Sequence, residues 1–227
     1  MVVVTLGLTT LVATLMATSA KTPRLPEDPR DVPREAQLTV TEARADLNGD
    51  GNQEVLLAVN ALTGETDPAR GSEVIFGIAA TPTAAERGKL LWSRHVMAET
   101  GQAAHDGELT AVDLDGDGRS ELILTWDRSL SSTRVERWCE IYTVADTASP
   151  RKVWEGAWEK DTRRDKDTPE AKREWMRREV DYGATRRGAG QAIVLKKVQA
   201  VEGGVKIDPP RVESEWVKVA LRVPPAH

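Results

Sequence analysis

Short apolar runs separated by polar, glycine-rich segments dominate the chain from residue 37 onward. The first runs are four to eight residues long and lie at 37–40, 54–59, 73–78 and 89–96. Runs of this length, rich in valine, isoleucine and leucine, are typical of β-strands, and the continuous run at 54–59 is typical of a buried inner strand. We therefore expect a mostly β protein.

A similar order of segments begins again after residue 100. A second group of strand-like runs lies at 108–112, 121–126, 133–144 and 151–158. A third group lies at 191–195, 197–201, 205–207 and 215–221. Within the third group, Gly203 and Gly204 separate two β-like runs, which predicts a hairpin turn. Each unit would hold about four short antiparallel strands.

The spacing of particular residues supports an internal repeat. Trp92, Trp154 and Trp216 are evenly spaced, at an interval close to that between Asp46 and Asp113, which open two acidic segments. We interpret this as a repeat domain at 37–223 with units at about 37–100, 101–160 and 180–223. The third unit would have lost its acidic segment, because Thr185, Arg186 and Arg187 stand where acids would be expected after Asp181.

A charged insertion at 161–179 separates the second and third units. Pro169 follows Thr168, a favourable helix cap, and the segment from Glu170 to Arg178 is rich in helix-forming residues. We expect a short helix here, either a solvated insertion or a helix that binds a partner.

The N-terminal segment has the pattern of a secretory signal. Residues 1–20 carry no charge, run through valine and leucine, and end in the small residues 17–20, which predicts cleavage after Ala20. A short uncleaved anchor is the alternative. Residues 21–36 contain four prolines and read as an extended linker. We expect a secreted, periplasmic or cell-surface protein with no stable membrane span after cleavage.

Charge and cysteine content narrow the function classes. The formal net charge of -5, the pI near 5.4 and the lack of a basic tract exclude nucleic acid as an expected partner. Cys139 is the only cysteine, so no intramolecular disulfide can form. An exported chain of this kind needs another stabiliser, and a bound cation would supply it.

Two acidic segments, 46–54 and 113–121, each precede a strand-like run. Oxygen-bearing side chains stand at their first, third, fifth and ninth positions, and two glycines between them allow a tight turn. Calcium prefers six to eight oxygen ligands, and without a cation these carboxylates would repel one another. The expected side-chain ligands are Asp46, Asn48, Asp50 and Glu54 in loop one, and Asp113, Asp115, Asp117 and Glu121 in loop two. The expected backbone carbonyl ligands are those of Asn52 and Arg119. Loop two, with more acids, should bind calcium more tightly.

The residues after each loop distinguish among calcium-binding families. An EF-hand loop has a glutamate at its twelfth position, whereas this chain has Leu57 and Leu124. The segments Asp46-Leu-Asn-Gly-Asp-Gly-x-x-Glu54 and Asp113-Leu-Asp-Gly-Asp-Gly-x-x-Glu121, with the apolar runs that follow, resemble FG-GAP or VCBS-type repeats. These repeats occur in integrin alpha-subunit propellers and many bacterial exported proteins.

The resemblance covers residues 37–158 and implies that each loop joins strands of a four-stranded propeller blade and holds calcium. The chain lacks a clear Phe-Gly…Gly-Ala-Pro segment, and three units are fewer than the four to eight blades of a closed propeller. The expected fold is therefore a set of tandem blade-like units, forming a partial or open propeller, a sandwich-like variant, or a ring completed by an oligomer.

Catalytic motifs are not recognisable in the sequence. It contains no Gly-x-Ser-x-Gly, His-Glu-x-x-His or phosphate-binding loop, and His95 and His105 stand apart from each other. The sequence favours a non-enzymatic, calcium-stabilised module with a structural role or a binding and adhesion role, whose ligand would be a protein or a carbohydrate. The alternative is a secreted hydrolase or carbohydrate-active enzyme on the same scaffold.

Overall fold

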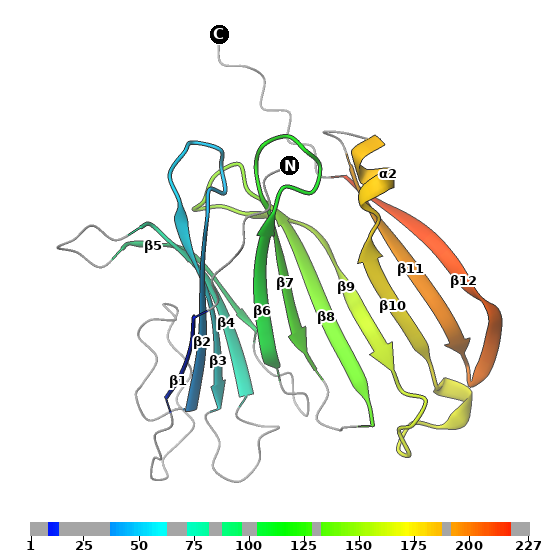
Figure 1. Ribbon diagram of the computed structural model, residues 1–227. Helices are drawn as coiled ribbons and strands as arrows, with labels where there is room; N and C mark the ends of the chain where they lie inside the picture. Colours follow the sequence, from blue (N-terminus) through cyan, green and yellow to red (C-terminus); the bar gives the residue numbers. More distant parts are fainter. Residues whose placement is uncertain are drawn as a thin grey trace.

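Two antiparallel β-sheets make up the described part of the chain (Figure 1). The computed structural model describes residues 9–13, 37–62, 72–81, 88–96, 104–128, 133–187 and 192–218. Strands within each sheet follow one another in chain order, so nearly every strand pairs with its neighbour in sequence. The prediction of a mostly β fold is confirmed.

The first sheet has the strand order β1-β2-β3-β4-β5. Its strands are β1 (Thr9–Ala13), β2 (Gln37–Ala45), β3 (Glu54–Leu62), β4 (Ser72–Ala79) and β5 (Leu90–Val96). Residues 54–59 of β3 are all buried, as the continuous apolar run predicted. β1 lies within the predicted signal peptide and pairs with the edge of β2. The rest of that peptide and the linker at 21–36 lie outside the described residues.

The second sheet has seven strands in the order β12-β11-β10-β9-β8-β7-β6. They are β6 (His105–Val112), β7 (Glu121–Asp127), β8 (Val135–Thr143), β9 (Arg151–Asp161), β10 (Trp175–Val180), β11 (Ala192–Glu202) and β12 (Val205–Lys218). Because β9 pairs with both β8 and β10, the second and third predicted units share one continuous sheet instead of forming separate blades. The described strands close neither a barrel nor a propeller.

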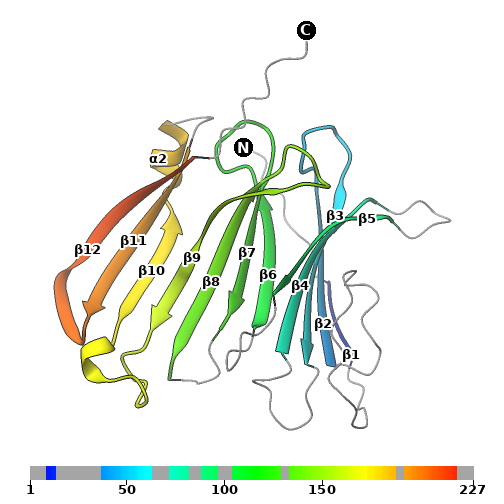
Figure 2. The ribbon, with the colours of Figure 1, turned by 180° about the vertical axis from the view of Figure 1, so that it is seen from behind.

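One hydrophobic core lies between the two sheets. Side chains on β7 alternate, so Leu122, Leu124 and Trp126 join this core. The ring of Phe76 on β4 lies 6.3 Å from that of Trp126, measured between centroids. β6 contacts β3 and β4 where the sheets meet, and the view from behind shows β6 beside β4 (Figure 2). Burial of this shared face holds the sheets together.

A second core lies on the opposite face of the seven-stranded sheet. It contains Cys139 and Ile141 of β8 together with Ile193 and Leu195 of β11. Two strands separate β8 from β11, so these side chains can share a cluster only because the sheet curves around it. A hydrogen bond of 2.9 Å from Trp154 Nε1 on β9 to a Glu215 carboxylate oxygen on β12 spans the same concave face.

The helix expected from Glu170 to Arg178 is wrong. The segment holds only the 3-10 helix η2 (Glu170–Lys172), followed by strand β10. β10 pairs with β9 on one side and β11 on the other, and Met176 is buried. Two sets of ladder hydrogen bonds and this burial outweigh the helix propensity of the segment.

The third predicted unit differs in detail from the first two. Residues 182–187 form the short helix α2 (Tyr182–Arg187), and Thr185 within it is fully buried. Trp92 and Trp154 lie on β5 and β9, the fourth strands of their units, whereas Trp216 lies on β12 and is 62 % exposed. No helix among the described residues is long and apolar enough to cross a membrane.

Candidate metal centre

The two acidic loops occupy equivalent positions in the two sheets. Loop one connects β2 to β3, and loop two connects β6 to β7. Both are closed by the same cross-strand pairing, Ala45 with Glu54 and Val112 with Glu121. The glycines at matching positions have positive φ angles, 76° at Gly49, 86° at Gly51, 83° at Gly116 and 88° at Gly118. Only glycine adopts this backbone region readily, which explains why both loops carry the pair.

The hydrogen bonds inside the two loops also correspond. The first aspartate of each loop accepts both glycine amides: Asp46 from Gly49 at 2.8 Å and Gly51 at 2.9 Å, and Asp113 from Gly116 at 2.7 Å and Gly118 at 3.1 Å. The aspartate at the fifth position of each loop accepts the amide of the seventh residue, Asp50 from Asn52 at 2.7 Å and Asp117 from Arg119 at 2.9 Å. These bonds turn the backbone around a common centre, so the sequence repeat is also a geometric repeat.

The closing glutamate returns to the start of each loop. Glu54 Oε2 accepts the Leu47 amide at 3.1 Å, and Glu121 Oε2 accepts the Leu114 amide at 2.9 Å. Leu47 and Leu114 are buried, so the second residue of each loop is an apolar anchor. The anchor sets the loop against the core, and the glutamate hydrogen bond fixes the ninth position close to the first.

Three carboxylates converge in loop two. Asp113, Asp115 and Asp117 each offer an oxygen, and these oxygens all lie within 4.8 Å of one another. In loop one the third position is Asn48, whose amide donates a 3.0 Å hydrogen bond to Asp50 Oδ2. A neutral amide at this position lowers the repulsion in loop one, while loop two concentrates more negative charge.

Burial and mutual repulsion perturb the carboxylates of loop two. Burial raises the pKa of Glu121 to about 8, and repulsion from three aspartates adds to the rise. The hydrogen bond from the Leu114 amide acts in the opposite direction but is outweighed. Burial and the neighbouring Asp117 also raise the pKa of Asp115, which is 4 % exposed. In loop one, burial raises the pKa of Glu54. No lysine or arginine pairs with Glu121 among the described residues, so a divalent cation fits this donor set.

The two loops touch each other across the junction between the sheets. The Ser120 amide of loop two donates a 3.3 Å hydrogen bond to the Leu47 carbonyl of loop one. A methyl group placed on Gly49 would lie 3.4 Å from the Gly118 carbonyl. All ten residues predicted as ligands therefore lie in two neighbouring loops, a proximity that the sequence did not reveal. Ion binding by these ten residues, including the Asn52 and Arg119 carbonyls, stays a prediction.

A buried ion cluster, missed by the sequence reasoning, also joins the sheets. Glu140 on β8 is 1 % exposed and accepts two hydrogen bonds from Arg94 of β5, at 3.1 and 3.0 Å. Tyr142 Oη and Lys152 Nζ also donate to Glu140, at 2.7 and 3.2 Å. Burial opposes ionisation of Glu140, but these donors outweigh it and lower its pKa. In the sequence, the only signal for this cluster is a glutamate, Glu140, inside the apolar run 138–144.

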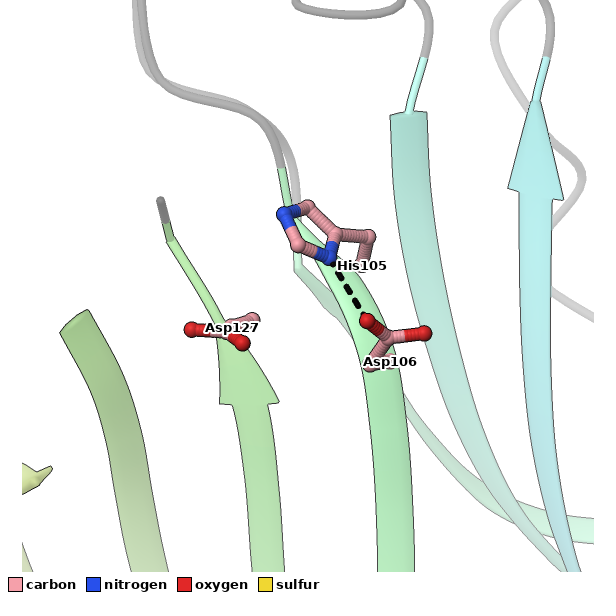
Figure 3. A group of neighbouring side chains, drawn as sticks. All are labelled: His105, Asp106 and Asp127. Carbon is pink, nitrogen blue, oxygen red and sulfur yellow. Dashed lines mark hydrogen bonds and ion pairs between the residues drawn. The ribbon is translucent and has the colours of Figure 1, made fainter. Parts of the chain in front are cut away.

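A second group of side chains that could hold a metal ion lies elsewhere on the β6–β7 hairpin. His105, Asp106 and Asp127 come together there, although the sequence showed His105 with no recognisable partner (Figure 3). His95, the other histidine considered, instead pairs with Glu73 at 2.7 Å. Cys139 is buried, and burial raises the pKa of its thiol, which agrees with a packing role.

A pocket of about 400 Å³ opens on the concave face of the seven-stranded sheet. Its lining includes the rings of Trp158 and Tyr182 and two ions of each sign, Glu108, Glu159, Arg137 and Arg177. Arg137 donates to Thr125 at 3.1 Å and pairs with Glu108 at 2.6 Å. The lining is thus charge-balanced and partly aromatic.

Comparisons of the chain with protein-family models, curated proteins and solved structures found no match. The resemblance to FG-GAP or VCBS-type repeats therefore stays a prediction that depends on the two loop motifs.

Proposed function

We propose that this chain is an exported β-repeat module that binds calcium in its two acidic loops and has a structural role or a binding and adhesion role. The observation that carries the proposal is the convergence of Asp113, Asp115 and Asp117 beside the buried Glu121, with no basic partner for Glu121 in the described residues. Loop one repeats the same hydrogen-bond pattern. We take the two hairpins to be copies of one ancestral unit.

Calcium suits these loops better than magnesium. The donors are carboxylate and carbonyl oxygens on a short, glycine-containing loop, which can adapt to the irregular shell of six to eight oxygens that calcium takes. Magnesium demands a stricter octahedron and retains its waters. A bound calcium ion would give the buried carboxylates of Glu121 and Asp115 a positively charged partner. Because loop two has four carboxylates and loop one has three, loop two should have the higher affinity.

The location of the loops indicates what the ions would do. Both loops lie at the junction of the sheets, where Ser120 and Leu47 are hydrogen-bonded. Ions bound there would stabilise the hairpins and their mutual contact by mass action, since calcium would bind the folded loops and not the unfolded chain. The ligand, a protein or a carbohydrate, would then bind to surfaces that the loops support, and the concave face is the strongest candidate.

Export is the second part of the proposal. Removal of residues 1–20 would take away β1 and leave β2 as the edge of the first sheet. N-terminal sequencing of material secreted by an expressing cell should find a start after Ala20. A retained Met1 on the secreted protein would contradict cleavage.

The calcium proposal is tested by thermal unfolding in calcium, in magnesium and in EDTA. We expect calcium to raise the melting temperature, magnesium to raise it less, and EDTA to remove the effect. Asp117→Asn should reduce the calcium effect more than Asp50→Asn does. Asp146→Asn is the matched control, because this aspartate caps an exposed turn through Ala148 and Ser149, outside both loops. A melting temperature equal in calcium and EDTA would refute the metal assignment.

A further inference from the structure

Three ligand-type side chains converge at the end of the β6–β7 hairpin away from loop two. His105 is the first residue of β6, Asp127 is the last residue of β7, and the two are cross-strand partners. Asp106 completes the group, and one ligand atom from each of the three lies within 4.8 Å of the others (Figure 3). The imidazole Nδ1 of His105 is 3.0 Å from Asp106 Oδ2.

The convergence depends on an irregularity in β6. Consecutive residues of a regular strand point to opposite faces, so His105 and Asp106 would normally diverge. Here the pairing shifts between His105 and Glu108, so that residues 106 and 107 face only Trp126 on β7. Asp106 has a φ of 51°, the one positive value among the described non-glycine residues. This β-bulge redirects the Asp106 side chain towards His105.

The first sheet holds the bulge in place. The Gly107 amide donates a 2.6 Å hydrogen bond to Asn60 Oδ1, and Asn60 Nδ2 donates a 3.2 Å hydrogen bond to the Gly107 carbonyl. A Cβ atom on Gly107 would overlap Val74 Cγ1, so only glycine fits. Asn60 is on β3 and Val74 is on β4, which means that sheet packing positions the three side chains before any ligand arrives.

We propose that His105, Asp106 and Asp127 bind a first-row divalent transition-metal ion. One imidazole nitrogen and two carboxylate oxygens are ligands that Zn²⁺ takes at about 2.0–2.2 Å, and in a tetrahedral shell ligands at that distance lie about 3.3–3.6 Å apart. The 3.0 Å separation of His105 Nδ1 and Asp106 Oδ2 is slightly shorter than this spacing, so a bound ion would replace the direct hydrogen bond between the two side chains. A change in the Asp127 side-chain rotamer would bring its carboxylate oxygen to the same spacing.

The donor set distinguishes this site from the acidic loops. A nitrogen ligand favours zinc or a neighbouring transition metal over calcium, which takes oxygen ligands. Two carboxylates balance the charge of a divalent ion. The His105 and Asp106 side chains are 28 % and 78 % exposed, so water or an outside ligand would complete the coordination shell. The site does not depend on calcium binding by the loops, because loop two lies at the other end of the β6–β7 hairpin and loop one joins β2 to β3.

The test is calorimetric titration of the full chain with Zn²⁺ in excess calcium, which keeps the loops filled. We expect one zinc ion per chain, weakened at least tenfold by Asp106→Asn and by His105→Gln. Asparagine tolerates positive φ, so Asp106→Asn removes a charged ligand without removing the bulge. His95→Gln is the control, because it removes a histidine that pairs with Glu73 instead.

Titration with Co²⁺ gives a second readout, since a nitrogen ligand alters the visible absorption of the bound ion. Loss of the cobalt spectrum in His105→Gln and its retention in His95→Gln would support the site. Zinc affinity that is undetectable in the wild type, or equal in wild type and Asp106→Asn, would overturn the proposal. Because the Asp106 side chain is 78 % exposed, we expect the Asp106→Asn variant to fold, and its far-ultraviolet circular dichroism should match that of the wild type.

Discussion

Removal of the Glu140 charge should destabilise the protein by separating the two sheets. Glu140→Gln leaves the side-chain volume nearly unchanged, but its amide would present a donor to a site already crowded with donors from Arg94, Tyr142 and Lys152. Breaking a buried ion pair by neutralising one partner costs about 3–5 kcal/mol. Arg94 and Lys152 are each 37 % exposed, so water recovers part of that loss, and we expect about 3 kcal/mol. A domain of this size should then melt roughly 6–12 °C lower.

The assay is urea unfolding of wild type and variant in calcium, monitored by tryptophan fluorescence. Glu155→Gln is the matched control, because Glu155 also pairs with Lys152 but is 54 % exposed. A surface substitution of this kind should change the unfolding free energy by less than about 0.5 kcal/mol. Equal losses in the two variants, or no loss in Glu140→Gln, would show that the Glu140 cluster does not hold the sheets together.

Four further outcomes follow from the same contacts. The folded protein lowers the pKa of Glu140 below its ordinary 4.5, so the stabilisation from the ionised glutamate is present above pH 4.5 and is lost as pH falls through the lowered value. The unfolding free energy of Glu140→Gln should therefore depend less on pH in acid than that of the wild type. Equal pH dependence in the two proteins would contradict this. Gly107→Ala should cost about 1–3 kcal/mol in urea unfolding, since its Cβ would overlap Val74, and an unchanged midpoint would refute the clash. Cys139 should react with a thiol reagent only after unfolding, because burial raises the pKa of its thiol; fast reaction of the folded protein would count against this. Glu121→Gln should weaken one calcium-binding step in calorimetry and leave the other unchanged. If both steps keep their wild-type affinity, Glu121 is not a calcium ligand.

Strand content and loop position could be predicted from the sequence because both depend on local patterns. The run at 54–59 is buried as predicted, and the long run at 133–144 contains β8 (Val135–Thr143). The helix predicted after Pro169 failed for the opposite reason. Its residues favour a helix in isolation, but β9 and β11 lie on either side and each offers an edge for hydrogen bonding. Pairing with both decides in favour of β10.

The acidic loops show where local information ends. Their residue spacing predicts the turn, the glycines with positive φ and the inward carboxylates, because every hydrogen bond involved joins residues no more than seven positions apart. Nothing in that spacing places loop one against loop two. Their contact through Ser120 and Leu47 exists because the two sheets pack face to face.

The sequence by itself thus determined the β content, the two hairpin loops and the grouping of their carboxylates, since strand propensity and loop geometry act over a few residues. Tertiary structure alone decided the contact between the loops, the Glu140 cluster between β5 and β8, and the bulge that unites His105 with Asp106. Each of these depends on packing between residues 46 or more positions apart, such as Asn60 with Gly107 and Arg94 with Glu140. Such contacts form only when burial of the shared apolar face brings the sheets together.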